Sequence, residues 1–567
     1  MASVVGKKRG KQTYYYLVES ARVEGKPRIV SQEYLGTAEE LATAMRGAGL
    51  GLPDRTQHKE FGAVAAAWSL LEDLGVAAII DEAAGTRRSD AGASLGAYLA
   101  LAALNRLAAP CSKLAFADWW AKTAAPRFTK IPASVLDHRR FWDAMHAVEL
   151  RDLEEISQAI ALRMVDLFGL ECSSVALDMT NFASFIDTAN HKAPIAQRGK
   201  AKQKRGDLRL VGLGLVVTRD GGIPLAWHAY PGDKPDVTQF PALIGQLRTR
   251  HEAICAAAGR RPADMTVVFD AGQNSEDNFA YLAGTGLHYI GSVPASDCPD
   301  LTALPASVRT VVDAGRFGGL TAYDTRREVY GAQRRAILTH SPELHQSQAR
   351  GFDGTTLAKA GKKLDELAAA LARGKTRRPR EKVAADIQAI THKPWARRVL
   401  TWQLNGEAPK DLRLSWDINQ AARAALEQEM FGKHVLITDH DDWPVAEVIA
   451  GYRSQSEAEF SFRQMKDPHV VSFNPMFHWT EHNIRVHVFT CVLALQLAHL
   501  MRLRARSAGL DLSVRALLGE LAGIGETVLL YQGERGRPRA HRMLTQTTPV
   551  QDKLIKTFHL NRYTPRR

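Results

Sequence analysis

The stretch that decides the fold contains Ser174-Val-Ala-Leu-Asp178, Leu208-Arg-Leu-Val-Gly-Leu-Gly-Leu-Val-Val-Thr218, Asp220-Gly221-Gly222 and Ile223-Pro-Leu-Ala-Trp-His-Ala-Tyr230. The first piece is a short apolar run that ends in an acid. The second piece alternates apolar residues and glycines in the manner of a strand. Asp220-Gly221-Gly222 is a strong turn signal between two strands. Together these pieces predict one strand followed by a hairpin.

The chain downstream continues the same α/β pattern. Asp236–Ala258 has helical spacing, and Met265–Asp270 is a second buried-strand run that ends in an acid. Phe279–Ala283 predicts another helix, and Leu287–Val293 predicts a further strand. The order strand, hairpin, helix, strand, helix, strand indicates a mixed α/β sheet.

The regions around this core have different patterns. The N-terminal region mixes basic residues with Tyr14-Tyr15-Tyr16, whereas apolar residues recur at helical spacing in Val64–Ala78 and Leu150–Leu167. We predict a small β-rich basic arm (1–50), a helical domain (51–165), a first part of the α/β core (166–300), an interruption with strand-like pieces and a charged helical stretch (301–440), a helical last part (441–506) and a helical basic tail (507–567).

Composition limits the possible protein classes. The 567 residues include 74 Lys plus Arg and 61 Asp plus Glu, which gives a formal net charge of +13. With 45% apolar and 24% charged residues, the chain can bury real cores, which excludes wholesale disorder, a collagen-like fibre and a disulfide-stapled miniprotein. The basic excess, concentrated in residues 535–567, fits a polyanionic partner.

Cysteines and apolar segments indicate a cytoplasmic protein without a membrane partner. The five cysteines are sparse and form no CxxC pair, as expected in a reducing compartment. Ala91–Leu104 and Val486–Met501 are too short or too polar for a span of about 20 residues, so we interpret both as buried helices. Nucleic acid is then the expected polyanion. Its phosphates would be contacted by the basic segments 7–11, 198–205, 373–382 and 535–567.

Two aspartates are candidate metal ligands. Asp178 and Asp270 each end a buried apolar run, which places a carboxylate at a sheet edge where a metal can reach it. A buried carboxylate without a partner is costly. Each aspartate alone is also compatible with a turn or a helix N-cap.

A third acid lies on a predicted helix, Val448–Lys466. At about 100° per residue, Tyr452, Glu459 and Lys466 share one face. Gln455 and Arg463 lie near that face, whereas Glu457 points the opposite way. The alternative is a solvated charged face with a Glu459–Arg463 pair.

The whole set resembles the insertion-sequence DDE transposases, in particular the branch with a Tyr-Arg-Glu-Lys signature around the third acid. The family spacing is Tyr, two residues, Arg, three residues, Glu, six residues, Lys. This chain has Tyr452, Gln455, Glu459 and Lys466 at that spacing, so Gln455 departs from the family Arg. Arg453 or Arg463 are candidates for supplying that positive charge.

Further blocks carry the resemblance over about residues 170–505. They follow in the family's order: Asp178-Met-Thr180, then Arg198-Gly199-Lys200 with Arg205 and Asp207, Pro231-Gly232-Asp233 with Asp236, Asp270-Ala-Gly272, and Pro475-x-Phe477-x-Trp479 with His487. Each block alone is a weak signal, but three acidic blocks in the same order make chance agreement improbable.

The resemblance implies a particular architecture and metal site. It implies an α/β RNase H-like catalytic core, with a mixed five-stranded sheet and flanking helices. A mostly β insertion at 301–440 would split this core, and an N-terminal helical domain would bind DNA. Asp178, Asp270 and Glu459 would be catalytic residues and metal ligands. Their hard oxygen ligands suit two Mg²⁺ (or Mn²⁺) ions per active site.

The implied function is DNA transposition. The enzyme would bind the inverted repeats at transposon ends, cut DNA and join the 3′-OH ends to target DNA, as a homodimer associated with the bacterial nucleoid. A base-stacking tryptophan is expected in the insertion or near it, although each candidate is also compatible with a core role. The implied DNA contacts are Thr180, Arg198, Lys200, Arg205, Tyr452, Gln455, Arg463, Lys466 and one of Trp402, Trp416 and Trp443.

Three other interpretations stay open. A structure-specific nuclease on the same fold would cut DNA without joining it. A regulator with a decayed active site would bind DNA without cutting it, and Gln455 leaves room for this. A zinc-dependent site is disfavoured, because the 19 histidines form no HExxH motif and no paired CxxC accompanies them.

Overall fold

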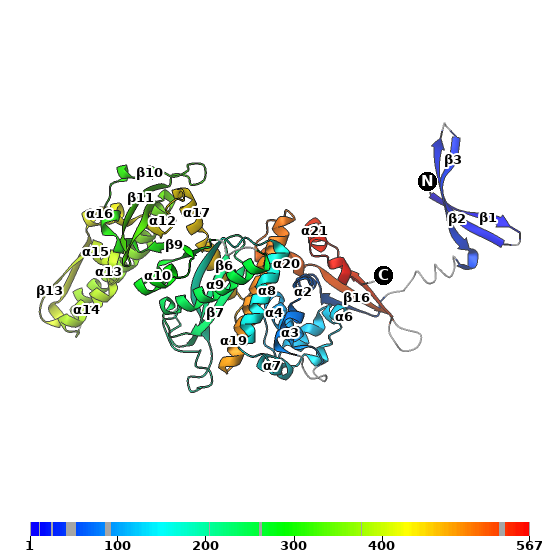
Figure 1. The fold of residues 1–567 in the computed structure, drawn as a ribbon, viewed down its shortest axis with the longest axis horizontal. Helices are drawn as coiled ribbons and strands as arrows, with labels where there is room; N and C mark the ends of the chain where they lie inside the picture. Colours follow the sequence, from blue (N-terminus) through cyan, green and yellow to red (C-terminus); the bar gives the residue numbers. More distant parts are fainter. Residues whose placement is uncertain are drawn as a thin grey trace. The chain divides into compact units, whose positions relative to one another are not determined.

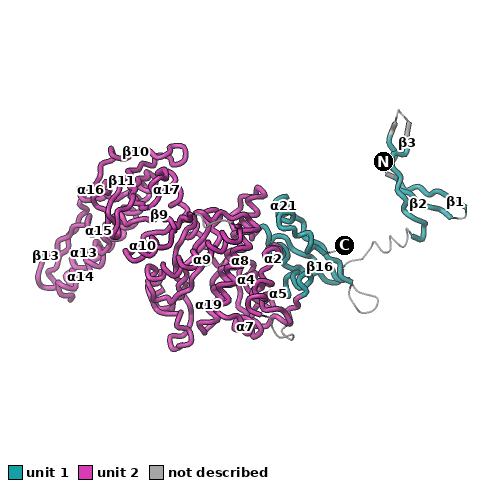
Figure 2. Tube along the Cα trace, in the orientation of Figure 1, with its two compact units in different colours: residues 1–65, 121–130, 520–567 teal, residues 66–120, 131–519 magenta. Residues whose placement is uncertain are grey.

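The computed structural model describes residues 2–10, 12–23, 26–40, 53–85, 92–202, 205–259, 264–375, 377–531 and 539–565. The chain divides into two compact units, which Figure 2 colours separately. The larger unit comprises residues 66–120 and 131–519, and the smaller unit comprises residues 1–65, 121–130 and 520–567.

A mixed sheet of nine strands forms the centre of the larger unit. Its strand order is β10-β11-β12-β15-β9-β8-β5-β6-β7. The strands are β5 (Ser174–Ser184), β6 (Arg209–Thr218), β7 (Pro224–Pro231), β8 (Thr266–Phe269), β9 (His288–Val293), β10 (Thr310–Val311), β11 (Thr321–Val329), β12 (Ala332–His340) and β15 (Lys433–Thr438). The expected five strands are therefore present in a larger sheet.

Strands β5 to β9 follow the predicted order. β5, β6 and β7 form an antiparallel meander, whereas β8 runs parallel to β5 and β9 runs parallel to β8. Gly221 and Gly222 make the predicted turn between β6 and β7, with φ values of 87° and 63° that favour glycine. The prediction of strand, hairpin, helix, strand, helix, strand is confirmed.

Helices cover both faces of this sheet. On one face, Leu177 of β5 packs in a common core with Leu243 of α9 (Phe240–Ala257) and Leu282 of α10 (Glu276–Ala283). Figure 1 shows α9 against β6 and β7. On the other face, Val268 of β8 shares a core with Val448 of α17 (Val445–Arg453). Neighbouring strand residues point to opposite faces, so adjacent positions in β5 and β8 serve different layers.

Helices come before the strands of the sheet in the sequence and again after them. They include α2 (Gly62–Leu74), α3 (Val76–Ala84), α4 (Leu95–Ala108), α5 (Phe116–Lys122), α7 (His138–Ala147), α8 (Asp152–Phe168), α19 (Glu481–Ser507) and α20 (Val514–Ala522). Ser94 and Thr480 cap the first turns of α4 and α19 through their hydroxyl oxygens. Residues 62–84 and 95–168 are mainly helical, and β4 (Arg55–Glu60) precedes these helices.

Helix α19 is long and apolar enough to cross a membrane, but 94% of its apolar window is buried inside the protein. Among the described residues, the bent pair α2 and α3 also passes the test by length and composition. Burial of this kind is typical of a core helix, as predicted for Val486–Met501.

The region predicted as a mostly β insertion, 301–440, is different in the structure. Its strands β10, β11, β12 and β15 extend the central sheet, because β15 pairs with β9. The remaining residues 342–430 form a mainly helical module with its own core, including Leu364, Ile387 and Leu426. Its elements are α12 (Pro342–Gly351), a π-helical turn (Phe352–Leu357), α13 (Ala358–Ala372), α14 (Arg380–Ile390), α15 (Pro394–Val399), β13 (Leu400–Asn405), β14 (Arg413–Ile418) and α16 (Gln420–Met430).

The smaller unit contains two three-stranded sheets. One sheet consists of β1 (Ala2–Arg9), β2 (Gln12–Val23) and β3 (Lys26–Thr37). It lies in the region for which we predicted a β-rich arm. In the other, β16 (Gly525–Tyr531) lies between β4 and β17 (Arg539–Leu544), next in sequence to α21 (Pro549–Thr557). The helical tail predicted for 507–567 is therefore wrong for 525–544. Glu526, which is fully buried, pairs there with Arg127 and Arg542.

Candidate active site on the central sheet

The sheet register places Asp178 and Asp270 side by side. Leu177 of β5 is the register partner of Phe269 of β8, and both pack toward α9. The next residue on each strand therefore points to the opposite face, toward α17 and α18 (Gln455–Lys466). Asp270 continues the extended backbone of β8, with φ −91° and ψ 176°. The two acids thus lie on one face of the sheet. Asp270 follows the end of β8 as predicted, whereas Asp178 lies within β5, which continues to Ser184, so the prediction that Asp178 ends its strand at a sheet edge is wrong.

One carboxylate oxygen of each aspartate is fixed by the backbone. Asp178 Oδ1 accepts a hydrogen bond from the Met179 amide at 2.7 Å, and Asp270 Oδ1 accepts one from the Gly272 amide at 2.9 Å. Asp270 is thereby the N-cap of a short 3₁₀ turn, which was the alternative interpretation of this residue. Capping and ligand roles are compatible, because a carboxylate has a second oxygen.

The third acid, Glu459, comes from α18, which packs against β5. Its side chain is exposed, and no hydrogen bond or ion pair engages it among the residues that the structure describes. The Glu459–Arg463 pair that was the alternative is not formed. Glu457 is half-buried beside Gly222. Burial raises its pKa, Arg502 opposes this rise and Asp220 adds to it, whereas the three acids of the site are not among the causes. Glu457 therefore points away from the site, as predicted.

The predicted single helix Val448–Lys466 is two helices. α17 ends at Arg453 and α18 begins at Gln455, with a turn at Ser454 whose hydroxyl donates to the Gly451 carbonyl at 2.6 Å. The seven-residue spacing from Glu459 to Lys466 stays within α18. Tyr452 belongs to α17, so its proximity to the acids comes from packing and not from a continuous helical face.

The three acids act on one another electrostatically. Burial raises the pKa of Asp178 to about 7; Lys202 opposes this rise, whereas the Asp270 and Glu459 carboxylates add to it. Burial raises the pKa of Tyr452 to about 12, a hydrogen bond with Ser292 opposes it, and the same three acids add to it. One phenol and three carboxylates therefore occupy a common electrostatic environment.

This donor set fits divalent metal ions. Like-charged carboxylates in a partly buried site repel one another, and a cation relieves that repulsion. No ion pair within 4.0 Å neutralises Asp178, Asp270 or Glu459 within the described ranges of the chain. The carboxylate oxygens are hard donors with lone pairs available for a metal, which suits Mg²⁺ or Mn²⁺. Mg²⁺ usually keeps several water molecules as further ligands.

Two lysines border the acids. Lys466 Nζ donates to Thr180 Oγ1 at 2.7 Å, and burial followed by Lys202 lowers its pKa while Asp178 opposes that shift. Lys202 forms an ion pair with Asp236 at 2.8 Å and also donates to the Met179 carbonyl. Thr180 itself is buried, with 3% of its surface exposed, so it positions Lys466. The predicted basic segment 198–205 contained Lys202 without singling it out.

The other predicted DNA-contacting residues differ in exposure. Arg198, Lys200 and Arg463 are exposed. Arg205 is also exposed and forms a bidentate pair with Asp207 at 2.9 and 2.7 Å. Gln455 is buried, and its amide donates to the Leu177 carbonyl at 2.8 Å, directly before Asp178. Gln455 thus joins α18 to β5.

The three tryptophan candidates are half-buried and lie in two places. Trp402 and Trp416 face each other across β13 and β14 in the helical module, and Trp416 Nε1 donates to Asp365 at 2.9 Å. Trp443 stacks on His440 with ring centres 3.8 Å apart, just before α17. Each packs against a hydrophobic core, as the alternative interpretation expected.

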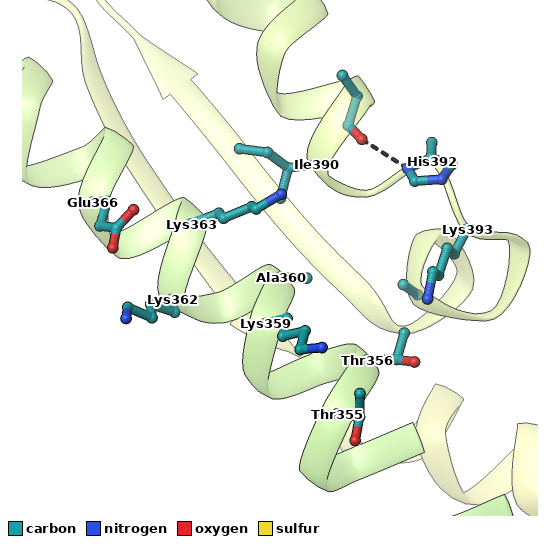
Figure 3. A pocket seen from close by; sticks show the side chains of 12 residues that line it. Thr355, Thr356, Lys359, Ala360, Lys362, Lys363, Glu366, Ile390, His392 and Lys393 are labelled. Carbon is teal, nitrogen blue, oxygen red and sulfur yellow. Dashed lines mark hydrogen bonds between the residues drawn. The ribbon is translucent and has the colours of Figure 1, made fainter. Parts of the chain in front are cut away.

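A separate basic cavity lies in the helical module. It has a volume of about 470 Å³. Figure 3 shows the lining side chains, which come from the π-helical turn, α13, the end of α14 and the segment after it. Its charged groups are Lys359, Lys362, Lys363, Lys393 and Glu366. An adjoining hollow is lined by Arg373, Lys375, Arg377 and Arg378. The basic segment predicted at 373–382 therefore borders a larger cationic surface.

The comparisons with known proteins find a weak likeness to solved structures. No protein-family model and no curated protein matches the chain. A solved structure that resembles it is the cryo-EM structure of a piggyBac transposase synaptic complex with hairpin DNA, with a TM-score of 0.37 and 8% identity. That likeness covers 83% of this chain and 82% of the other. A TM-score this low establishes neither fold nor function, so the function proposed below rests on the chain's own residues.

Proposed function

We propose that this protein is a DDE-type DNA transposase with an RNase H-like catalytic core. The proposal rests on the placement of Asp178 and Asp270 on one face of the central sheet and of Glu459 on α18, which packs against β5, with both Asp270 and Glu459 acting electrostatically on Asp178. The antiparallel meander followed by two parallel strands supports the expected core. The Tyr452, Glu459 and Lys466 spacing supports the insertion-sequence branch.

The three acids would hold two Mg²⁺ or Mn²⁺ ions. Such ions, when bound, activate an attacking oxygen and stabilise the charge on the leaving oxygen of a phosphodiester. The protein's contribution is a fixed geometry, because Asp178 and Asp270 are held by backbone amides and Glu459 by a packed helix. The same site would serve water in the cutting step and a 3′-OH in the joining step, so neither step needs a covalent enzyme intermediate.

Neighbouring side chains would orient the scissile phosphate. Because the pKa of Tyr452 is about 12, its phenol stays protonated at neutral pH and can donate a hydrogen bond to a phosphate oxygen. Lys466, held by Thr180, supplies a positive charge at the edge of the acid cluster. Arg463, Arg198, Lys200 and Arg205 would contact phosphates farther along the strand.

The basic surfaces would bind the rest of the DNA. The cavity of the helical module and the N- and C-terminal basic segments would neutralise phosphates, which makes binding strongly salt-dependent. Phosphate contacts position DNA without reading its sequence. We place recognition of the transposon ends in the helical N-terminal region, and a tryptophan among Trp402, Trp416 and Trp443 as a base-stacking candidate. Pairing of two ends would require a homodimer, in the bacterial cytoplasm at the nucleoid.

A joining assay tests the proposal. Linear DNA that carries the sequences flanking the gene is incubated with target plasmid, Mg²⁺ and the full-length protein, and strand products are resolved by gel. We expect end-specific cuts and joined products, and neither product with Asp270→Asn. Cuts without joining would indicate the nuclease alternative, and DNA binding without cuts would indicate the regulator; either result would overturn the proposal.

A further inference from the structure

Four basic side chains meet inside the larger unit, away from solvent. Arg106 belongs to α4 and Lys113 follows it, His478 precedes α19, and His487 belongs to α19. Their exposed fractions are 2%, 6%, 6% and 0%, respectively. We name these four residues the buried basic cluster. Burying two cationic side chains is costly unless a counter-charge accompanies them.

Backbone carbonyls and rings satisfy only part of the cluster. The Arg106 guanidinium donates to the carbonyl of Cys111 at 2.6 Å and, more weakly, to the carbonyl of Ser472 at 3.4 Å. His487 Nε2 lies 2.9 Å from the Phe473 carbonyl. Lys113 Nζ lies 5.2 Å from the centre of the Phe141 ring. These contacts bring no negative charge.

Three buried nitrogens of the cluster have no hydrogen-bond partner among the described residues: Arg106 Nε, Lys113 Nζ and His487 Nδ1. The titratable groups that act on the cluster are its own members and the thiols of Cys111 and Cys491. Burial raises the pKa of the Cys491 thiol to about 11, so this thiol is neutral at physiological pH. No carboxylate of the described chain acts on the cluster in these interactions.

We propose that the buried basic cluster binds a small inorganic anion of halide size, such as chloride. Arg106 Nε and Lys113 Nζ are unpartnered donors, and the same two side chains supply the positive charge. His487 Nδ1 is not a donor, because His487 Nε2 carries the ring proton and donates it to the Phe473 carbonyl. The burial of all four side chains excludes a DNA phosphodiester, which would have to bring its strand with it. This site is independent of the proposed DNA chemistry.

The anion would bind at the end of α4, where this region meets α19 and residues 472–478, which follow α18. Arg106 already donates to the Ser472 carbonyl of that segment. Phe473 of that segment stacks on Phe182 of β5 with ring centres 4.3 Å apart, and Lys466 lies over the Phe182 ring at 5.5 Å. Anion binding therefore stabilises the segment behind the third-acid helix.

Loss of a proton from Lys113 is the competing way to remove the uncompensated charge. Burial and the Arg106 charge lower the pKa of Lys113 to about 7. A bound anion would favour the protonated lysine, so chloride should stabilise the protein more at pH 6 than at pH 8.5. A lysine that simply becomes neutral would give no dependence on the anion.

Bromide provides a direct test. Crystals of the full-length protein grown in NaBr should show an anomalous peak beside Lys113 Nζ. In solution, NaCl should raise the Tm of the wild type by a few degrees over sodium gluconate at equal ionic strength. Lys113→Met should lose this chloride-dependent rise, whereas the exposed-lysine control Lys122→Met should keep it.

Two results would overturn the proposal. One is a bromide map with surface peaks but none beside Lys113 Nζ. The other is a chloride-dependent rise in Tm that is the same in Lys113→Met as in the wild type. If Lys113→Met does not fold, the bromide map of the wild type still decides. Failure here leaves the transposase proposal untouched, because that proposal is tested by DNA products.

Discussion

The acid site on the central sheet and the basic cavity of the helical module differ in the sign of their charges and in how far those charges are buried. In the acid site, Asp178 and Asp270 are fixed by strand register, and Glu459 is fixed by a helix packed on the same strand. In the module, Lys359, Lys362 and their neighbours project from exposed helix surface around an open cavity. The acid site brings negative charges together in a partly buried place. The module spreads positive charges over a surface that water reaches.

This difference sets how each region should respond to mutation. A partly buried group acts in a low dielectric, where a single charge has a large effect on its neighbours. Exposed charges are screened by water and salt, so one of them contributes little and their sum matters. We therefore expect single substitutions to be decisive at the acids and nearly silent in the module.

The largest effect is expected at the acids. Asp178→Asn, Asp270→Asn and Glu459→Gln should each lower the Mg²⁺-dependent cleavage rate by at least about 10²-fold, because each would remove an ion ligand. Glu457→Gln is the matched control, since it makes the same change two residues away on α18 and faces another direction. Single-turnover cleavage of end DNA measures both; a control that loses as much as Glu459→Gln would break the comparison.

A second effect concerns stability and pH in metal-free protein. Because the pKa of Asp178 is raised to about 7, the folded protein keeps a proton that the unfolded chain has lost above about pH 4. The group's contribution to stability therefore falls as pH rises from about 4 to 7. Asp178→Asn should gain about 2 kcal/mol over the wild type between pH 5 and pH 8, measured by urea unfolding in EDTA. A gain that does not depend on pH would show that Asp178 titrates normally.

A smaller effect is expected from the support of Lys466. Thr180→Val removes the hydroxyl that accepts from Lys466 Nζ and should slow cleavage about tenfold, the size of one hydrogen bond to a charged group. Thr180→Ser keeps the hydroxyl and should retain most of the rate. Equal rates in Thr180→Val and Thr180→Ser would show that this hydrogen bond does not position the lysine.

The smallest effect per residue is expected in the module. Lys362→Ala alone should change DNA affinity less than about twofold at physiological salt. Replacing Lys359, Lys362, Lys363 and Lys393 together should reduce the slope of log K against log[salt] by about 0.9 for each phosphate that the protein no longer neutralises. Fluorescence anisotropy across a salt series measures this slope; an unchanged slope would remove the module from the DNA-binding surface.

The sequence predicted the parts of the site that depend on local pattern. An apolar run that ends in an acid located Asp178 and Asp270, and helical spacing located Glu459 and Lys466. The sequence predicted Tyr452 near these residues on one continuous helix. The turn at Ser454 interrupts that helix, so packing of α17 brings Tyr452 there instead. Nothing in the local pattern of Ser454 signals that turn.

The parts that depend on long-range pairing could not be predicted. Short apolar pieces such as those of β11 and β15 do not reveal which sheet edge they join, so the sequence alone favours a separate insertion. The same limit applies to β16, which pairs with a strand more than four hundred residues earlier. The buried basic cluster was missed because Arg106 and His487 lie far apart in the sequence, and each alone is an ordinary residue of a helix.

The most direct test of the central claim is the metal preference of Asp270→Cys in cleavage of end DNA. A thiolate is a softer ligand than a carboxylate, so it disfavours Mg²⁺ more than Mn²⁺. If Asp270 holds a catalytic ion, the ratio of the Mn²⁺ rate to the Mg²⁺ rate should rise at least about tenfold over that of the wild type. A ratio equal to that of the wild type would contradict a metal-ligand role for Asp270.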